Sequence, residues 1–246
     1  MNKKYTYVWV SLIILIFGII VVPRIVERIK SNSIVEMDRM NTVPQKKGLS
    51  YITLDGKKRK VPSFQLMNQD SLLISDKDYI GKVYVVEFFF TSCPSICPIM
   101  TDNLVSLQNH FKAEEDFGVA SFTITPDYDT PKVLKRYAEK NGITDMDWHL
   151  MTGDKDVIYD LANSGFNIFA AEMPDAPGGF EHSGLFALVD RQGYIRSRMD
   201  KFGNPLVYYR GAITKEMGEN DHGEVEQISI LQEDIAKLLK EEYGSN

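Results

Sequence analysis

The chain has 246 residues, with 28 Lys and Arg against 34 Asp and Glu, so its formal net charge is −6 and its pI is near 5.3. This acidic balance argues against nucleic acid as a partner, because phosphate binding depends on clustered basic residues. Two cysteines cannot build a disulfide scaffold or an all-cysteine zinc site. They can form one redox pair, or supply part of a metal site.

The N-terminal segment predicts a membrane anchor. No charged residue lies between Tyr5 and Val22, and a helix of this length spans about 27 Å, close to the roughly 30 Å hydrocarbon core of a bilayer. A cleaved signal peptide is the alternative, but the following residues, 23–28, lack a small-residue cleavage site. We therefore expect residues 1–30 to be an anchor containing one transmembrane helix, and the polar, aperiodic residues 31–50 to be a tether.

Residues 51–246 predict a single domain in which strands alternate with helices. The expected elements are a strand over 82–90, a helix over 100–111, a strand over 119–124, a helix from Thr130 to about Gly142, a short helix over 154–162, a hairpin of strands 185–189 and 194–198, and a final helix over 228–243. β-Branched and aromatic residues fill the strands, and apolar residues recur at helical spacing in the helices. This order predicts an α/β, thioredoxin-like sandwich around a mixed central sheet.

Both cysteines lie between the first of these strands and the helix after it, in the segment TSCPSICP at 91–98. Pro98 at the first helical position would make Cys97 the N-cap, where the helix dipole lowers a thiol pKa. We expect Cys93 on the preceding turn, with both sulfurs at the same exposed edge of the sheet. The three intervening residues permit a Cys93–Cys97 disulfide, redox-active or structural, or one metal ion between two thiolates.

A third metal ligand would have to come from one of four histidines, His110, His149, His182 and His222. His182 is the best candidate, because it follows a Pro- and Gly-rich stretch and precedes a predicted strand, so that a loop could carry it to the cysteines. Two thiolates and one imidazole suit three-coordinate Cu(I), whereas Zn(II) would want a fourth ligand. Mg²⁺ and Ca²⁺ are excluded, since they need a shell of oxygens.

The segment FFFTSCPSICP at 88–98 resembles the signature of the SCO/SenC family of copper-handling proteins in cytochrome c oxidase assembly. The resemblance covers roughly residues 60–245 and includes Asp129-Thr130-Pro131 and His182-Ser183. Two departures are Thr125 before Pro126, where the family often has Asp, and Glu181 before the histidine, where it often has Asp. Neither departure removes a ligand.

This resemblance implies a thioredoxin-like fold and a copper ion, as Cu(I) or Cu(II), bound by Cys93, Cys97 and His182. The chain would be a metallochaperone and not an enzyme, serving the copper-bearing subunit of cytochrome c oxidase or another copper donor or acceptor. Its domain would lie on the periplasmic side of the inner membrane, which it would cross once.

A second function remains open, that of a thiol-disulfide oxidoreductase which keeps the partner's copper-ligand cysteines reduced. That activity needs Cys93 and Cys97 but not His182, because thiol exchange uses only the two sulfurs. A peroxiredoxin-type peroxidase is less well supported, since no Arg lies near the cysteines.

Overall fold

The computed structural model describes residues 48–242 except 55, 176 and 201–203, together with positions 12, 15, 17 and 21. The chain divides into two compact units, Met1–Gln45 and Lys46–Asn246. Most of the predicted anchor and tether falls outside the described residues. Among the residues that are described, no helix is long and apolar enough to cross a membrane.

A mixed sheet is the centre of the folded unit. Its strands run in the order β1 (Ser50–Tyr51), β12 (Ile195–Ser197), β11 (Leu185–Val189), β6 (Val83–Phe89), β7 (Phe117–Thr123), β8 (Trp148–Thr152), β4 (Gln65–Asn68) and β5 (Leu73–Ser75), with β13 (Tyr209–Arg210) pairing with β11. Strands β6, β7 and β8 are parallel, and the other pairs are antiparallel. The predicted α/β fold with a mixed central sheet is therefore confirmed, and β1 shows that Ser50, assigned to the tether, already belongs to this sheet.

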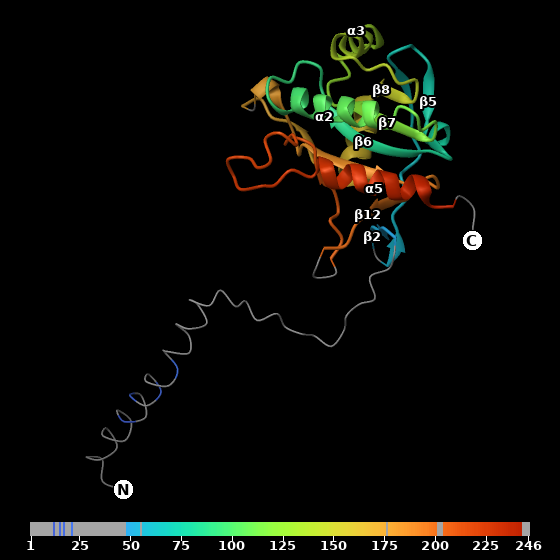
Figure 1. Ribbon diagram of the computed structural model, residues 1–246. Helices are drawn as coiled ribbons and strands as arrows, with labels where there is room; N and C mark the ends of the chain where they lie inside the picture. Colours follow the sequence, from blue (N-terminus) through green and yellow to red (C-terminus); the bar gives the residue numbers. More distant parts are fainter. Residues whose placement is uncertain are drawn as a thin grey trace. The chain divides into compact units, whose positions relative to one another are not determined.

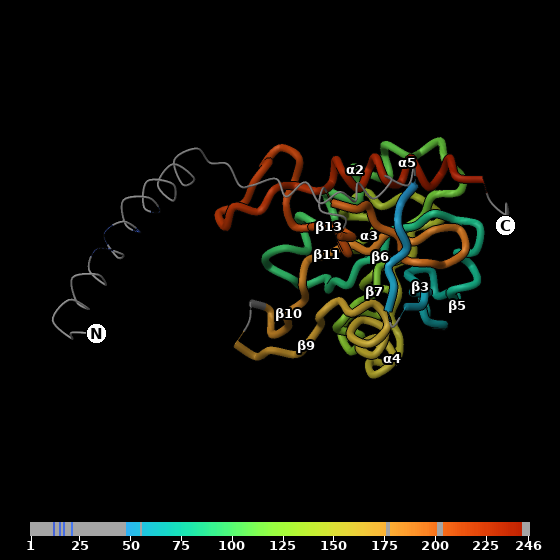
Figure 2. Tube along the Cα trace, turned by 90° about the horizontal axis from the view of Figure 1, so that it is seen from below, coloured from blue at the N-terminus to red at the C-terminus, as the bar shows by residue number. Residues whose placement is uncertain are grey.

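Helices cover both faces of the sheet. The helical elements are η1 (Asp76–Tyr79), α2 (Ile96–His110), α3 (Pro131–Asn141), α4 (Lys155–Asp160), the π-helix η2 (Leu161–Phe166), η3 (Pro177–Gly179) and α5 (Ile228–Lys240). Helices α2 and α5 lie on one side of β6 and β7, and α4 lies on the other (Figures 1 and 2). Two small hairpins complete the unit, β2 (Thr53–Leu54) with β3 (Lys57–Lys58), and β9 (Ala170–Glu172) with β10 (Phe180–His182).

Successive side chains of β6 contact opposite helical layers, because side chains alternate across a strand. Phe88 meets Phe166 of η2 at a ring-centroid distance of 5.8 Å, and Phe89 meets Tyr137 of α3 at 5.5 Å. Every residue of β6 is buried. The strand that carries the cysteine segment at its end is thus held by packing on both faces, which gives the segment a rigid starting point.

Every element predicted between residues 82 and 242 is present, with ends shifted by a few residues. Thr130 is the N-cap of α3, and Gly142 ends that helix in the left-handed conformation, as expected. The predicted N-cap of α2 is wrong: Ser95 holds that position and Cys97 lies inside the first turn. Pro98 tolerates this placement, because the first-turn amides of a helix have no intrahelical acceptor.

Candidate metal centre

The turn that carries Cys93 is anchored on a buried carboxylate. The Cys93 amide donates to the Phe90 carbonyl oxygen at 3.2 Å, which closes the turn after β6. Thr91 donates its amide to Asp129 Oδ2 at 3.1 Å and its hydroxyl to Oδ1. Asp129 is fully buried and also accepts hydrogen bonds from Thr123 and Thr125 at the end of β7. This carboxylate therefore ties the cysteine turn to the neighbouring strand.

The hairpin β9–β10 brings His182 to the cysteines. His182 pairs with Ala170 in the hairpin, so it belongs to a strand and not to the predicted loop. At the hairpin turn, Gly178 has φ +84°, and a Cβ there would lie 2.9 Å from Cε2 of Phe90. Glycine thus permits both the backbone conformation and the close approach of the hairpin to the cysteine turn. The His182 ring packs edge-on against Phe90, with centroids 5.9 Å apart.

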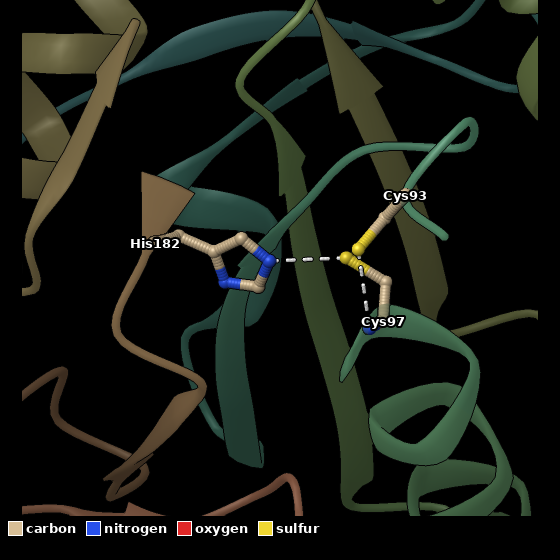
Figure 3. A group of neighbouring side chains, drawn as sticks. All are labelled: Cys93, Cys97 and His182. Carbon is tan, nitrogen blue, oxygen red and sulfur yellow. Dashed lines mark hydrogen bonds between the residues drawn. The ribbon is translucent and has the colours of Figure 1, made fainter. Parts of the chain in front are cut away.

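Figure 3 shows the three predicted ligand side chains converging from the turn, the first turn of α2 and the end of β10. His182 Nε2 lies 3.0 Å from Cys97 Sγ, and the Cys97 amide donates to Cys93 Sγ at 3.5 Å. All three potential ligand atoms lie within 4.8 Å of one another. The side chains are buried, with 9% of Cys93, 1% of Cys97 and 6% of His182 exposed. The expectation of two sulfurs on an exposed edge is therefore wrong, because the β9–β10 hairpin covers them.

The pKa values of the two thiols shift in opposite directions. A hydrogen bond with Cys97 lowers the pKa of Cys93 to about 3, with a further contribution from His182, while burial opposes the shift. The same hydrogen bond and burial raise the pKa of Cys97. The direction of these shifts favours the thiolate at Cys93, whose sulfur also accepts a hydrogen bond from the Cys97 amide, whereas the helix-dipole argument had favoured Cys97.

The spacing of the cluster suits one soft metal ion. Metal–sulfur bonds of about 2.3 Å and metal–nitrogen bonds of about 2.0 Å place two ligand atoms of one ion at most about 4.6 Å apart, close to the 4.8 Å bound found here. Among the described residues, no fourth Cys, His, Asp or Glu joins the group. Two thiolates and one imidazole favour a soft ion of low coordination number. The same two sulfurs, unbonded to each other, could also close a disulfide.

The other three histidines lie elsewhere in the fold. His149 is half-buried in β8 and its Nδ1 is 3.2 Å from the Asn68 amide nitrogen. His110 ends α2 beside Gln232 of α5, and His222 lies in an exposed turn. Glu181, the carboxylate next to His182, is exposed. Of the histidines, only His182 reaches the cysteines.

One buried acidic side chain, in the strand that leads to the cysteine turn, was not singled out from the sequence. Glu87 lies in the middle of β6, is 2% exposed, and accepts a hydrogen bond from Ser121 Oγ at 2.7 Å. Its second oxygen, Oε2, has no hydrogen-bond partner among the described residues. Burial raises the pKa of Glu87 to about 7. A lone charged residue inside an apolar strand was the sequence signal that could have revealed it.

Comparison with known proteins gives a consistent result. The model of the SCO1/SenC family matches residues 53–214. The SCO1 protein homologue of Bacillus subtilis is 32% identical over 138 residues, which cover 55% of this chain and 71% of that protein. One similar solved structure is that of BsSco, described as a member of the Sco family of cytochrome c oxidase assembly proteins with a disulfide switch. It is 26% identical to this chain, with a TM-score of 0.59, and the match covers 75% of this chain and 95% of BsSco. Yeast Sco1 with copper bound shares the fold at 19% identity and a TM-score of 0.54, covering 76% and 92%.

Proposed function

The chain belongs to the SCO1/SenC family, and we propose that it binds a copper ion through Cys93, Cys97 and His182 and delivers it during the assembly of cytochrome c oxidase. The observation that carries this proposal is the convergence of two sulfurs and one imidazole nitrogen within 4.8 Å of one another, from three separate elements. A set of two thiolates and one neutral imidazole holds Cu(I) with a local charge of −1. It leaves open coordination positions through which the ion can pass to a partner.

We propose also that the anchor predicted over residues 1–30 holds the domain on the periplasmic side of the inner membrane. The support is the uncharged stretch from Tyr5 to Val22 and the polar residues that follow it. The partner is then a copper-bearing oxidase subunit or another copper protein that presents its site on the same side. Protease protection of the full-length chain in spheroplasts and inverted vesicles tests the orientation.

Copper binding is tested by offering Cu(I) to the reduced full-length chain in mild detergent against a competing chelator. We expect one copper per chain. Cys97→Ser and His182→Ala each remove a ligand, and each should weaken binding at least about tenfold, equivalent to about 1.4 kcal/mol. His222→Ala is the matched control, because His222 is exposed and does not belong to the group of ligand atoms that lie within 4.8 Å of one another. If His182→Ala binds copper as tightly as wild type, His182 is not a copper ligand.

A second function, thiol-disulfide exchange, is favoured by the adjacent free cysteines and by the low pKa of Cys93. The related BsSco is described with a disulfide switch. His182→Ala separates the two functions, because copper binding needs the imidazole and exchange does not. If the wild-type chain retains no copper but cycles readily between dithiol and Cys93–Cys97 disulfide, the reductase role is the correct one.

A further inference from the structure

A basic hairpin lies at the edge of the folded unit, close in sequence to the predicted tether. It consists of β2, β3 and the two residues that follow, Arg59 and Lys60, and Figure 1 shows β2 at the outer edge of the fold. Over residues 46–60 the sequence holds six basic side chains and one acidic side chain, in a chain whose net charge is −6. This stretch therefore carries the charge opposite to that of the whole protein.

Backbone and side-chain contacts hold the basic hairpin on the domain. The Arg59 amide donates to the Ile52 carbonyl oxygen at 2.8 Å, and the Arg59 carbonyl oxygen accepts from the Ile195 amide at 3.0 Å. Nη2 of Arg59 donates to the carbonyl oxygens of Ser164 and Gly165 at 3.0 and 2.6 Å. Arg59 is thus used to attach the hairpin, and the lysines around it extend from an anchored backbone.

The three lysines of the hairpin carry charges that the domain does not neutralise. Lys57, Lys58 and Lys60 are exposed, and no ion pair within the part of the chain that the structure describes involves any of them. Lys58 Nζ lies 3.6 Å from the ring centroid of Tyr51, and Lys60 Nζ lies 5.8 Å from that of Tyr194. A cation–π contact orders an ammonium group without cancelling its charge. The hairpin therefore presents three positive charges to an anionic partner.

An exposed apolar side chain accompanies these lysines. Leu54 pairs with Lys57 in the hairpin and is 57% exposed. The rings of Tyr51 and Tyr194 meet edge-on at 5.6 Å beside the lysines. Lysine, tyrosine and an exposed leucine together are typical of a surface that lies at a lipid headgroup layer, because tyrosine is favoured at that depth and an apolar side chain can enter it. The composition of the hairpin therefore favours a bilayer surface.

We propose that the basic hairpin binds the surface of an anionic phospholipid bilayer, with its three lysines against the lipid phosphates and Leu54 between the headgroups. This inference rests on the proposed membrane anchor and gives the folded domain a second contact with the bilayer. Residues 23–47 alone separate the apolar N-terminal stretch from Gly48, and even fully extended they cover at most about 90 Å. An anchored chain thus keeps the hairpin at a high local concentration near the lipid, so a weak surface affinity is sufficient.

The test places the full-length chain in nanodiscs of phosphatidylcholine, with or without phosphatidylglycerol. Leu54→Trp, in a chain with Trp9→Phe, reports lipid contact through quenching by brominated lipids, because the other tryptophan, Trp148, is buried. Quenching should be at least about threefold stronger in the anionic nanodiscs, and the difference should disappear in 1 M salt, where the screening length falls to about 3 Å. Equal quenching in the two membranes overturns the proposal.

A matched tryptophan shows whether the contact belongs to the hairpin. Leu73→Trp is the control, because Leu73 is 58% exposed and lies in β5, at the opposite end of the strand order from β1. Its quenching should be weak and equal in both membranes. Quenching of Leu73→Trp as strong as that of Leu54→Trp in the anionic nanodiscs overturns the assignment to the hairpin.

The charges are tested by replacing all three hairpin lysines with glutamine in the Leu54→Trp chain. This change should abolish the difference between the two membranes, because the attraction to lipid phosphates is lost. The control set has the same net charge and carries glutamine in place of three exposed lysines elsewhere, Lys112, Lys132 and Lys140. The control set should retain the difference. An equal loss in both sets would show that net charge, and not the hairpin, attracts the domain.

A second measurement needs no substitution and decides the question if Leu54→Trp does not fold. A water-soluble acetylating reagent is applied to the wild-type chain in both nanodiscs, and the modified lysines are identified by mass spectrometry. Lys57 should react about fivefold more slowly in the anionic nanodiscs relative to Lys132, because headgroups shield it. The same relative rate in both membranes overturns the proposal. Binding of the hairpin lysines to polyglutamate without any lipid contact would instead identify an acidic protein partner.

Failure of the inference is distinguishable from failure of the proposed function. A chain that does not incorporate into nanodiscs contradicts the proposed anchor, and flotation of the same lysine variants with anionic vesicles then tests the hairpin directly. Copper stoichiometry should stay at one per chain when the three hairpin lysines are replaced. Absence of copper binding in wild type would contradict the proposed function and would leave the lipid result unchanged.

Discussion

Two buried carboxyl groups near the cysteine cluster have opposite surroundings. Asp129, just after β7, receives hydrogen bonds from the Thr91 amide and from the hydroxyls of Thr91, Thr123 and Thr125. Glu87, in the middle of β6, receives one from Ser121, and its Oε2 has no partner among the described residues. Asp129 thus accepts four hydrogen bonds and Glu87 accepts one.

The difference shows that burial alone does not decide the role of a carboxyl group. Donors around Asp129 compensate the loss of hydration, so its carboxylate can join the cysteine turn to β7. Around Glu87 one hydrogen bond does not offset burial, so the pKa rises to about 7 and the neutral acid is favoured. We therefore expect Asp129 to stabilise the site through its contacts, and Glu87 to make stability depend on pH.

The largest expected effect comes from Asp129→Ala. Its removal leaves the Thr91 amide and three hydroxyls without their acceptor, which should lower the free energy of unfolding by about 3 to 4 kcal/mol. Urea unfolding of the reduced chain measures this loss. Asp127→Ala is the matched control, because Asp127 is exposed in the same turn, and its effect should stay within about 0.5 kcal/mol. Similar losses in both variants would contradict the anchoring role.

Glu87→Gln should produce a smaller effect that depends on pH. The folded-state pKa of Glu87 is about 7, above its ordinary value of 4.5, so folding favours the protonated acid. Its contribution to stability is complete below pH 4.5 and is lost as the pH rises through 7, by about 3 kcal/mol at 1.36 kcal/mol per pKa unit. Glutamine does not ionise, so the variant should gain about 3 kcal/mol relative to wild type between pH 4.5 and 8.

Urea unfolding at the two pH values measures this gain directly. The difference between Glu87→Gln and wild type should be small at pH 4.5 and should favour the variant at pH 8. A difference that is the same at both values would show that Glu87 does not change its protonation on folding.

The smallest expected effect comes from Ser121→Ala. Ser121 Oγ donates to Glu87 Oε1 and accepts from Trp148 Nε1 at 2.9 Å, so the variant leaves a buried indole N–H unpaired. The free energy of unfolding should fall by about 1 to 2 kcal/mol. Because the Ser121 hydrogen bond lowers the pKa of Glu87, its loss should also move the pH-dependent loss of stability to higher pH. If stability is lost over the same pH range in Ser121→Ala and in wild type, the two side chains are not coupled in this way.

The sequence was sufficient for the two candidate cysteine ligands and for the order of the main elements, because these depend on local signals. The cysteine motif lies between a continuous apolar strand and an amphipathic helix, and Thr130-Pro131 and Gly142 mark the ends of α3. Local signals left His182 as one candidate among four histidines, and the family resemblance singled it out. The start of α2 was predicted wrongly, because Pro98 was placed at the first helical position, whereas the helix begins at Ile96 after Ser95.

Residue types and their spacing along the chain thus determined what chemistry this protein can carry: two sulfurs four residues apart, one distant imidazole and a net negative charge. Tertiary structure alone decided the directions in which the two thiol pKa values shift, how far each cysteine is buried, and which carboxyl groups are buried. Those properties arise from contacts between segments far apart in the chain, such as His182 against Cys97 and Thr91 against Asp129. The free energy of a charge depends on its three-dimensional surroundings, and these are not encoded in any local run of residues.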